Sequence, residues 1–236
     1  MRPLIRNWRF VEREHLGRTY RFFENGATFV ACGGIGPEAA RRATEALIEF
    51  FQPQEILSVG FAGALNSDLK VGDTFAPSSI VDVMDGSRVE TGIGCGVLLS
   101  LSSVASPEQK ARLAEAYRAQ AVDMEAGAVA RGAQSHGIRF SAIKVISDEC
   151  NFAMPPVERF VSGEGQFRTG AFLGFVSPRP WLWLSVFRLS RNNREASAAL
   201  CRALSRYLPQ LLDGGGPNGR DTNVEAKRRE LLKVHN

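Results

Sequence analysis

Strand-like and helix-like hydrophobic patterns alternate along the first two thirds of the chain. Over residues 19–33, two aromatic and β-branched runs flank an Asn-Gly pair at Asn25, which is the strongest short signal for a hairpin. Residues 34–53 predict a helix, because Pro37 suits a first helical turn and Pro53 stops the pattern. The chain therefore opens with a predicted hairpin and a helix.

The middle of the chain continues this alternation. An apolar run over residues 55–65 ends in small residues, which predicts a buried strand that enters a tight loop. A capping box at Ser106 predicts a helix over residues 107–118. Further strands are expected over residues 74–83, 96–104 and 139–148, and a strand end that passes into a helix over 121–137. Strands that alternate with helices indicate an α/β sheet with both faces covered.

The last third of the chain has a different pattern. Residues 149–180 hold four prolines and several glycines and predict a long irregular segment, as in many lids and binding loops. Residues 179–192 are aromatic and basic, and the apolar positions after them predict an amphipathic helix packed on the sheet. We expect one domain over residues 1–212 and a flexible tail over residues 213–236.

The composition is that of a globular protein. The chain has 236 residues, of which 44% are hydrophobic and 23% charged, and it holds no apolar run of about 18 residues that would span a membrane. Its four cysteines are scattered and its histidines number three, which argues against a cysteine-based zinc site and against His-rich chemistry. The N-terminus lacks an apolar secretory segment, and scattered cysteines fit a reducing cytoplasm. We therefore expect a cytoplasmic protein with no metal and no cofactor.

The net charge of +4 is modest, but its excess lies late in the chain. Residues 179–206 carry six arginines against one glutamate, which suits contact with an anionic surface. A solvated helix face accounts for the same charges and is the simpler interpretation. We expect no nucleic-acid partner.

Two acidic residues stand where predicted strands end. Glu125 follows Met124 at a strand-to-helix junction, and Asp148 follows Ser147 at the end of an apolar strand. In open α/β sheets ligands collect outside the carboxyl ends of the strands, so we expect both acids to face one crevice. Burial favours the protonated form of a carboxylic acid, so an aspartate after an apolar run is suited to act as a general acid. Taken alone, each acid is more often a helix cap or a satisfied turn residue.

Two turns rich in small residues lie near predicted strand or helix ends. Residues 60–64 follow a strand, and their small side chains let the backbone approach a planar ligand. Residues 33–37 form a glycine turn at a helix start, which is suited to hold an anion, although it lacks the lysine of a P-loop. Tight packing turns look the same, so neither segment defines a site by itself.

Four segments occur together in an order that is more specific than its parts. They are GGIGPEAA (33–40), ILSVGFAGAL (56–65), AVDMEAGAVA (121–130) and AIKVISD (142–148). In this combination the chain resembles the nucleoside phosphorylase and nucleosidase superfamily, most closely its methylthioadenosine/S-adenosylhomocysteine nucleosidase branch. The resemblance implies an α/β fold with a mixed central sheet flanked by helices. It also implies cleavage of the N-glycosidic bond of an adenine nucleoside.

The resemblance implies a role for each matching residue. Asp148 would protonate the departing purine at N7, and Ser147 would hold Asp148 in position. Glu125 would bind the ribose hydroxyls, while Met124 packs against the sugar. The chemistry is coherent, because a purine leaves readily only when protonated and the sugar becomes oxocarbenium-like, as in glycoside hydrolysis.

The loop that would border the base with the backbone of Ala62 and Gly63 departs from the family pattern. Phosphorolytic members place an arginine and a serine around this loop to hold phosphate, whereas this chain has Ser58 and Phe61 there. Without the arginine a phosphate dianion has little to pair with, which favours hydrolysis. A phosphorolytic purine nucleoside phosphorylase stays open as the alternative, as does an inactive homologue that binds nucleosides or a membrane surface.

The beginning of the chain also differs from the family. Family members start with a strand and a loop glutamate that positions the attacking water, whereas residues 1–9 look like the helix after that loop. The first strand is therefore missing from the sequence as it stands. A start placed too far downstream and a degraded copy both account for this, and the retained chemistry downstream favours the former. The resemblance also implies a homodimer.

The late region looks most like the hopanoid-associated phosphorylases, which implies an adenosylhopane-type lipid nucleoside as substrate and a place in hopanoid biosynthesis. In that case Trp181, Trp183 and Phe187 would contact a membrane or a lipid tail. A core helix with snorkelling arginines is the alternative interpretation of the same residues.

Overall fold

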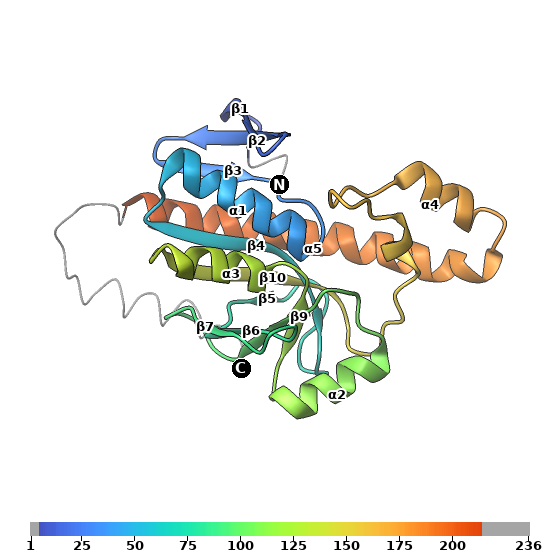
Figure 1. The fold of residues 1–236 in the computed structure, drawn as a ribbon. Coiled ribbons are helices and arrows are strands. Elements are labelled where there is room, and N and C mark those ends of the chain that lie inside the picture. Colours follow the sequence, from blue (N-terminus) through green and yellow to red (C-terminus); the bar gives the residue numbers. More distant parts are fainter. Residues whose placement is uncertain (1–4, 214–236) are drawn as a thin grey trace.

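The protein contains two β-sheets of different size (Figure 1). A computed structural model describes residues 5–213, and the surroundings of side chains as far as residue 206. Apart from its first residue, the predicted tail over 213–236 lies outside the described residues. The smaller sheet is antiparallel and consists of β1 (Arg9–His15), β2 (Arg18–Asn25) and β3 (Thr28–Ala31).

The larger sheet is mixed and has seven strands in the order β5-β10-β4-β9-β8-β6-β7. β10 runs parallel to β4, and β8 runs parallel to β6 and β9. The pairs β4–β9, β5–β10 and β6–β7 are antiparallel. The strands are β4 (Glu55–Ala64), β5 (Thr74–Phe75), β6 (Ser79–Asp82), β7 (Arg88–Glu90), β8 (Val97–Ser100), β9 (Ala121–Asp123) and β10 (Arg139–Asp148).

Helices cover both faces of the larger sheet. They are α1 (Pro37–Phe51), α2 (Pro107–Tyr117), α3 (Ala126–Ser135), the short 3-10 helix η1 (Val157–Phe160), α4 (Thr169–Val176) and α5 (Pro180–Asp213). Ala142 and Ile146 of β10 share a core with α1 and α3. Val145, on the opposite face of β10, packs with Leu200 of α5, which Figure 1 shows passing behind β4. The predicted mixed sheet flanked by helices is confirmed.

The local signals in the sequence fix several element ends. The predicted hairpin is formed by β2 and β3 around the turn that follows Asn25. The capping box at the start of α2 is present in full: Ser106 Oγ accepts the Gln109 N–H at 3.3 Å, and Gln109 Oε1 accepts the Ser106 N–H at 2.9 Å. Gly137 follows α3 with φ of 65°, in the left-handed region that glycine adopts at low cost.

The helix expected over residues 1–9 is wrong for its described part. Residues 5–8 form a bend and turn, and β1 starts at Arg9 and pairs with β2 along its whole length. The small sheet is held on α1 by an aromatic cluster, in which Phe22 is fully buried and its ring lies 4.9 Å from that of Phe51. The strand pairing and this aromatic core decide the conformation.

The late region is more regular than its composition predicts. The segment over 149–180 contains η1 and α4, and α5 already begins at Pro180. Trp181, Trp183 and Phe187 lie on α5 but are 71%, 57% and 68% exposed, so the interpretation as a core helix is wrong. Among the helices within residues 5–213, none is both long enough and apolar enough to cross a membrane.

Candidate active site

The two acidic residues singled out in the sequence lie after strands that are both neighbours of β4 in the large sheet. Asp148 at the end of β10 is opposite Gly63 of β4, and Gly63 is opposite Val122 of β9. Neighbouring strands are about 4.8 Å apart, so Asp148 and Val122 are separated by roughly 10 Å. Glu125 follows β9 directly, at the start of α3. Because β9 runs antiparallel to β4 whereas β10 runs parallel to it, the chain after Val122 runs back along β10, where Asp123 contacts Lys144.

Asp148 is 5% exposed, and both of its carboxylate oxygens accept hydrogen bonds. Ser147 Oγ donates to Oδ1 at 2.8 Å, and the ammonium group of Lys110, from α2, binds Oδ2. A Cβ atom at Gly63 would lie 2.7 Å from Oδ2, so this position requires glycine. Ser147 Oγ also lies 3.4 Å from the carbonyl oxygen of Ala62. The structure thus brings together four residues singled out in the sequence, and it adds Lys110.

Glu125 is held by backbone N–H groups rather than by a cation. Its Oε1 accepts the Gly36 N–H at 2.8 Å, and its Oε2 accepts the Met124 N–H at 3.3 Å. Burial raises the pKa of Glu125, the nearby Asp123 carboxylate raises it further, and the Gly36 N–H opposes both effects. The glycine turn over residues 33–37 was expected to suit an anion, and the anion that it holds is the carboxylate of Glu125.

A second buried ion pair lies beside Glu125. Lys144 of β10 contacts Asp123 of β9 with Nζ 2.8 Å from Oδ2, and its Nζ also donates to Ser58 Oγ at 3.0 Å. Asp123 Oδ2 in turn accepts the N–H of Ala126 at the start of α3. The ammonium group of Lys144 therefore lies next to Ser58, the position at which the expected phosphate-binding arginine is absent. The carboxylate of Asp123 balances the charge of this ammonium group.

Sequence reasoning missed both lysines. Lys144 stands alone in an apolar strand, and Lys110 occupies the same helical face as Leu113 and Ala114, which pack in the core. A single charged residue within an apolar pattern is the signal that would have found them, because a buried charge is stable only when it is paired.

A cavity of about 380 Å³ opens next to Met124. Its wall consists of the start of α1, the loop over residues 102–104, η1 and the segment that follows η1. Gly36, which binds Glu125, also lines the cavity, whereas Asp148 and Glu125 do not. Within the described residues, the group around Asp148 and the group around Glu125 share no hydrogen bond. The cavity lies on the side of Glu125, through Gly36 and Met124.

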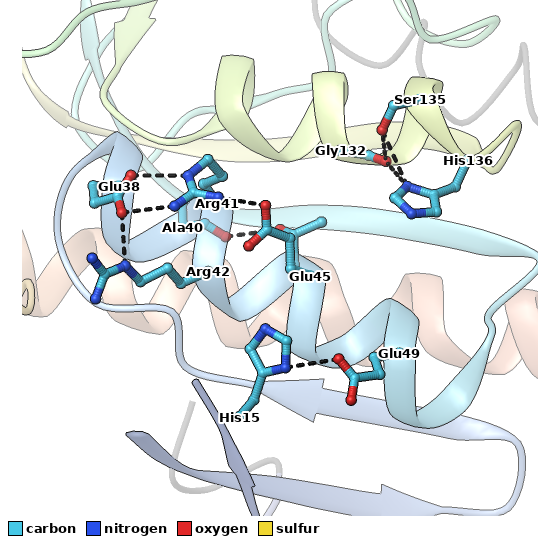
Figure 2. A network of polar contacts seen from close by, with 11 residues as sticks. His15, Glu38, Ala40, Arg41, Arg42, Glu45, Glu49, Gly132, Ser135 and His136 are labelled. Carbon is cyan, nitrogen blue, oxygen red and sulfur yellow. Dashed lines mark hydrogen bonds and ion pairs between the residues drawn. The ribbon is translucent and has the colours of Figure 1, made fainter. Parts of the chain in front are cut away.

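Glu38 on the cavity rim is balanced by two arginines (Figure 2). Arg41 Nη2 and Arg42 Nε lie 2.8 and 2.7 Å from Glu38 Oε1, and hydrogen bonds from Arg41 and then Arg42 lower the pKa of Glu38 to about 2. The described histidines lie elsewhere: His15 contacts Glu49, and His136 contacts the Gly132 carbonyl at the end of α3. These two histidines therefore do not belong to the polar contacts around Asp148 and Glu125.

The chain matches the phosphorylase superfamily over residues 3–100 and 93–166. It is 27% identical over 153 residues to the 5′-methylthioadenosine/S-adenosylhomocysteine nucleosidase of Staphylococcus aureus (strain JH9), a match that covers 50% of this chain and 67% of that protein. A crystal structure of the same enzyme from Helicobacter pylori has a TM-score of 0.56 at 25% identity and covers 64% of this chain and 82% of that chain. The futalosine hydrolase of Helicobacter pylori has a TM-score of 0.54 at 22% identity, over 81% of this chain and 89% of that chain, which shows the shared fold. The chain therefore belongs to the phosphorylase superfamily.

Proposed function

We propose that this protein cleaves the N-glycosidic bond of an adenine nucleoside by hydrolysis. The observation that carries the proposal is the environment of Asp148, a buried acid at the end of β10 that is fixed by Ser147 and backed by Gly63; Glu125, beside the cavity-lining residue Met124, is the second carboxylate that we assign to the site. The nucleosidases to which the chain is similar, at 25–27% identity, point to the same reaction class.

The proposed roles follow from where the side chains lie. Asp148 delivers a proton to purine N7, and Ser147 orients its carboxyl group. Glu125 accepts hydrogen bonds from the ribose hydroxyls, and Met124, on the wall of the cavity, packs against the sugar. The backbone of residues 62–63 borders the base. General acid catalysis of this kind contributes about 10²–10⁴-fold to the rate.

Charge balance supports hydrolysis rather than phosphorolysis. A phosphate dianion needs a cation with a free hydrogen-bonding face. The buried ammonium of Lys144 is bound by Asp123 and Ser58. A phosphorylase remains the second candidate function, and dependence of the rate on phosphate concentration distinguishes the two.

The direct test is release of adenine, followed by chromatography, from methylthioadenosine, S-adenosylhomocysteine and adenosylhopane. We expect release from at least one of them without phosphate, and a loss of about 10²–10⁴-fold in Asp148→Asn, as for loss of a general acid. Asp85→Asn, which changes an exposed carboxylate far along the chain, is the matched control. Binding of adenosine analogues by calorimetry without any turnover would overturn the proposal and identify an inactive homologue.

We further propose that the substrate is lipid-linked and that the face formed by α4 and the start of α5 contacts an anionic lipid surface. Trp183, Phe187 and Arg191 are spaced four residues apart and share one side of α5, and all three are exposed. Exposed aromatic side chains next to arginines suit the interface of an anionic membrane.

The cavity and this exposed face belong to the same part of the molecule. Phe167 lines the cavity, and its ring lies 5.4 Å from that of Phe172 in α4. The next residue along α4, Leu173, is 55% exposed. Figure 1 shows η1, α4 and the start of α5 together at one end of the protein. A lipid chain that leaves the cavity would therefore meet the exposed apolar side chains directly.

Co-sedimentation with vesicles tests this surface. We expect binding to vesicles of phosphatidylglycerol but not of phosphatidylcholine, weakened by salt and by combined Ala substitution of Trp181, Trp183 and Phe187. Met84→Ser removes a side chain that is 70% exposed elsewhere and serves as the control.

We also propose a cytoplasmic homodimer. If the aromatic substitutions convert a dimer to a monomer and leave vesicle binding unchanged, the face is a dimer interface and the lipid proposal is wrong.

A further inference from the structure

Lys110 is the least expected charged residue of the site. It belongs to α2, is 2% exposed, and is the one residue of that helix that is fully buried. Its Nζ binds Asp148 Oδ2 and donates to the carbonyl oxygen of Glu149 at 3.0 Å. A lysine is buried in this way only when a partner compensates its charge, and that partner is the proposed general acid.

The pair lies against the backbone of residues 62–63, which is proposed to border the purine. A side chain at Gly63 would lie 2.7 Å from Asp148 Oδ2 and 3.1 Å from Lys110 Nζ, so both atoms border the backbone of residues 62–63. The charged groups around Lys110 are few. Asp148 of β10 is in contact, β4 presents the neutral backbone of Gly63, and the Asp123–Lys144 pair lies on β9 and β10 farther along the sheet.

The hydrogen bonds of Asp148 create a difficulty for simple acid catalysis. Ser147 Oγ lies at one oxygen and the Lys110 ammonium group at the other, so both oxygens of Asp148 are already engaged by polar partners. The purine nevertheless needs a proton at N7 before it can leave. The group in contact that carries a transferable proton is the ammonium of Lys110.

We propose that Lys110 supplies, through Asp148, the proton that reaches the purine. The inference rests on the proposed function and deepens it. As the bond between C1′ and N9 breaks, its electron pair passes to the purine; Lys110 Nζ passes a proton to Asp148 Oδ2, and the carboxyl group so formed passes a proton to N7 and returns to the carboxylate. Water adds to C1′ and loses a proton to solvent, and the neutral amine of Lys110 takes up a proton from solvent. Lys110 is a positioning residue, because it acts on the substrate through Asp148.

Substitution of Lys110 by arginine or by methionine distinguishes proton supply from charge compensation of Asp148. Arginine keeps the positive charge beside Asp148 but does not give up a proton in proteins, whereas methionine removes the charge and keeps the length of the side chain. We expect Lys110→Arg to lower kcat by at least 10²-fold at every pH, with KM changed less than threefold, in line with the loss of an acid catalyst.

The pH profile carries the second half of the test. Methionine cannot supply a proton, so Asp148 then depends on protons from solvent, and the activity of Lys110→Met should fall as the pH is raised from about 5 to about 9. The wild type should keep its activity across that range. Lys70→Met, a substitution of an exposed lysine, is the control, and thermal unfolding confirms that each variant is folded. A wild-type pH profile in Lys110→Met, or more than a third of wild-type kcat in Lys110→Arg, overturns the inference.

Adenine binding distinguishes failure of this inference from failure of the proposed function. Calorimetry in buffers of different ionisation enthalpy measures the protons taken up when adenine binds, whether or not the protein turns over a nucleoside. We expect proton exchange in the wild type that is lost in Lys110→Arg. Binding without any difference between the two proteins refutes the role of Lys110, whereas absence of adenine binding in the wild type refutes the proposed function.

Discussion

Removal of the Lys144 ammonium group is expected to destabilise the protein, because it leaves the buried carboxylate of Asp123 without a cation to balance its charge. The side chains of Lys144 and Asp123 are 1% and 0% exposed, and they are joined over 2.8 Å between β10 and β9. Breaking one side of a buried ion pair typically costs about 3–5 kcal/mol, whereas removing both charges is often neutral or stabilising. Methionine has a similar length, so the cost of Lys144→Met should come from charge rather than from a cavity.

The expected loss is large relative to the stability of a domain. A native domain is typically stable by about 5–15 kcal/mol, so removal of one charge takes a substantial part of the total. In a protein of this size each kcal/mol lowers the Tm by about 2–4 °C, which gives an expected decrease of roughly 6–20 °C.

Thermal and urea unfolding of four proteins tests this reasoning. They are the wild type, Lys144→Met, Asp123→Asn and the double variant. Both single variants should be destabilised, and the double variant should be more stable than the sum of the single losses predicts, because the two groups interact directly. A Tm within about 2 °C of the wild type for Lys144→Met, or strictly additive losses, would refute the assignment of a stabilising pair.

Three further substitutions have defined outcomes. Gly63→Ala should cost about 1–3 kcal/mol by overpacking and lower adenine release, since its Cβ would lie 2.7 Å from Asp148 Oδ2; unfolding and chromatography measure the two effects. Glu125→Gln should stabilise the protein at neutral pH but not in acid. The pKa of Glu125 is raised in the folded state, so the folded state binds a proton more tightly than the unfolded state and loses stability as the pH rises through that pKa. Unfolding at several pH values tests the sign, and a gain in stability in acid alone contradicts it. Ser106→Ala should cost about 1 kcal/mol by loss of the cap of α2, visible as a lower Tm.

The order of strands and helices could be predicted because the local sequence signals agree with the burial of each element in the folded protein. The Asn-Gly turn, the capping box at Ser106 and the apolar runs that became β4 and β10 each fix an element whose burial agrees with the local preference. Residues 5–9 were misjudged because they were compared with a family helix: residues 5–8 form a bend and turn, and Arg9 begins β1, which is fixed by pairing with β2.

The site could be predicted only in part. The positions of Asp148 and Glu125 follow from the rule that ligands gather at the carboxyl ends of strands, but their partners do not. Lys110 and Asp148 are brought together by the packing of α2 against the sheet, a contact between elements that no periodicity encodes. The exposure of Trp181 is equally invisible, because an apolar helical pattern does not show which face the rest of the chain covers.

The distribution of cations explains why the two carboxylates suit different parts of one reaction. Asp148 is paired with Lys110, whereas Glu125 accepts only backbone N–H groups among its described hydrogen bonds, and burial raises its pKa. An unpaired buried carboxylate is costly in the empty site. That cost decreases when positive charge develops on the sugar beside it, which happens in the transition state and not in the bound nucleoside. Since only interactions that strengthen in the transition state raise kcat, the proposed roles agree with this distribution: the lack of a cation at Glu125 would favour the breaking of the bond, and the cation at Asp148 would serve the departing base.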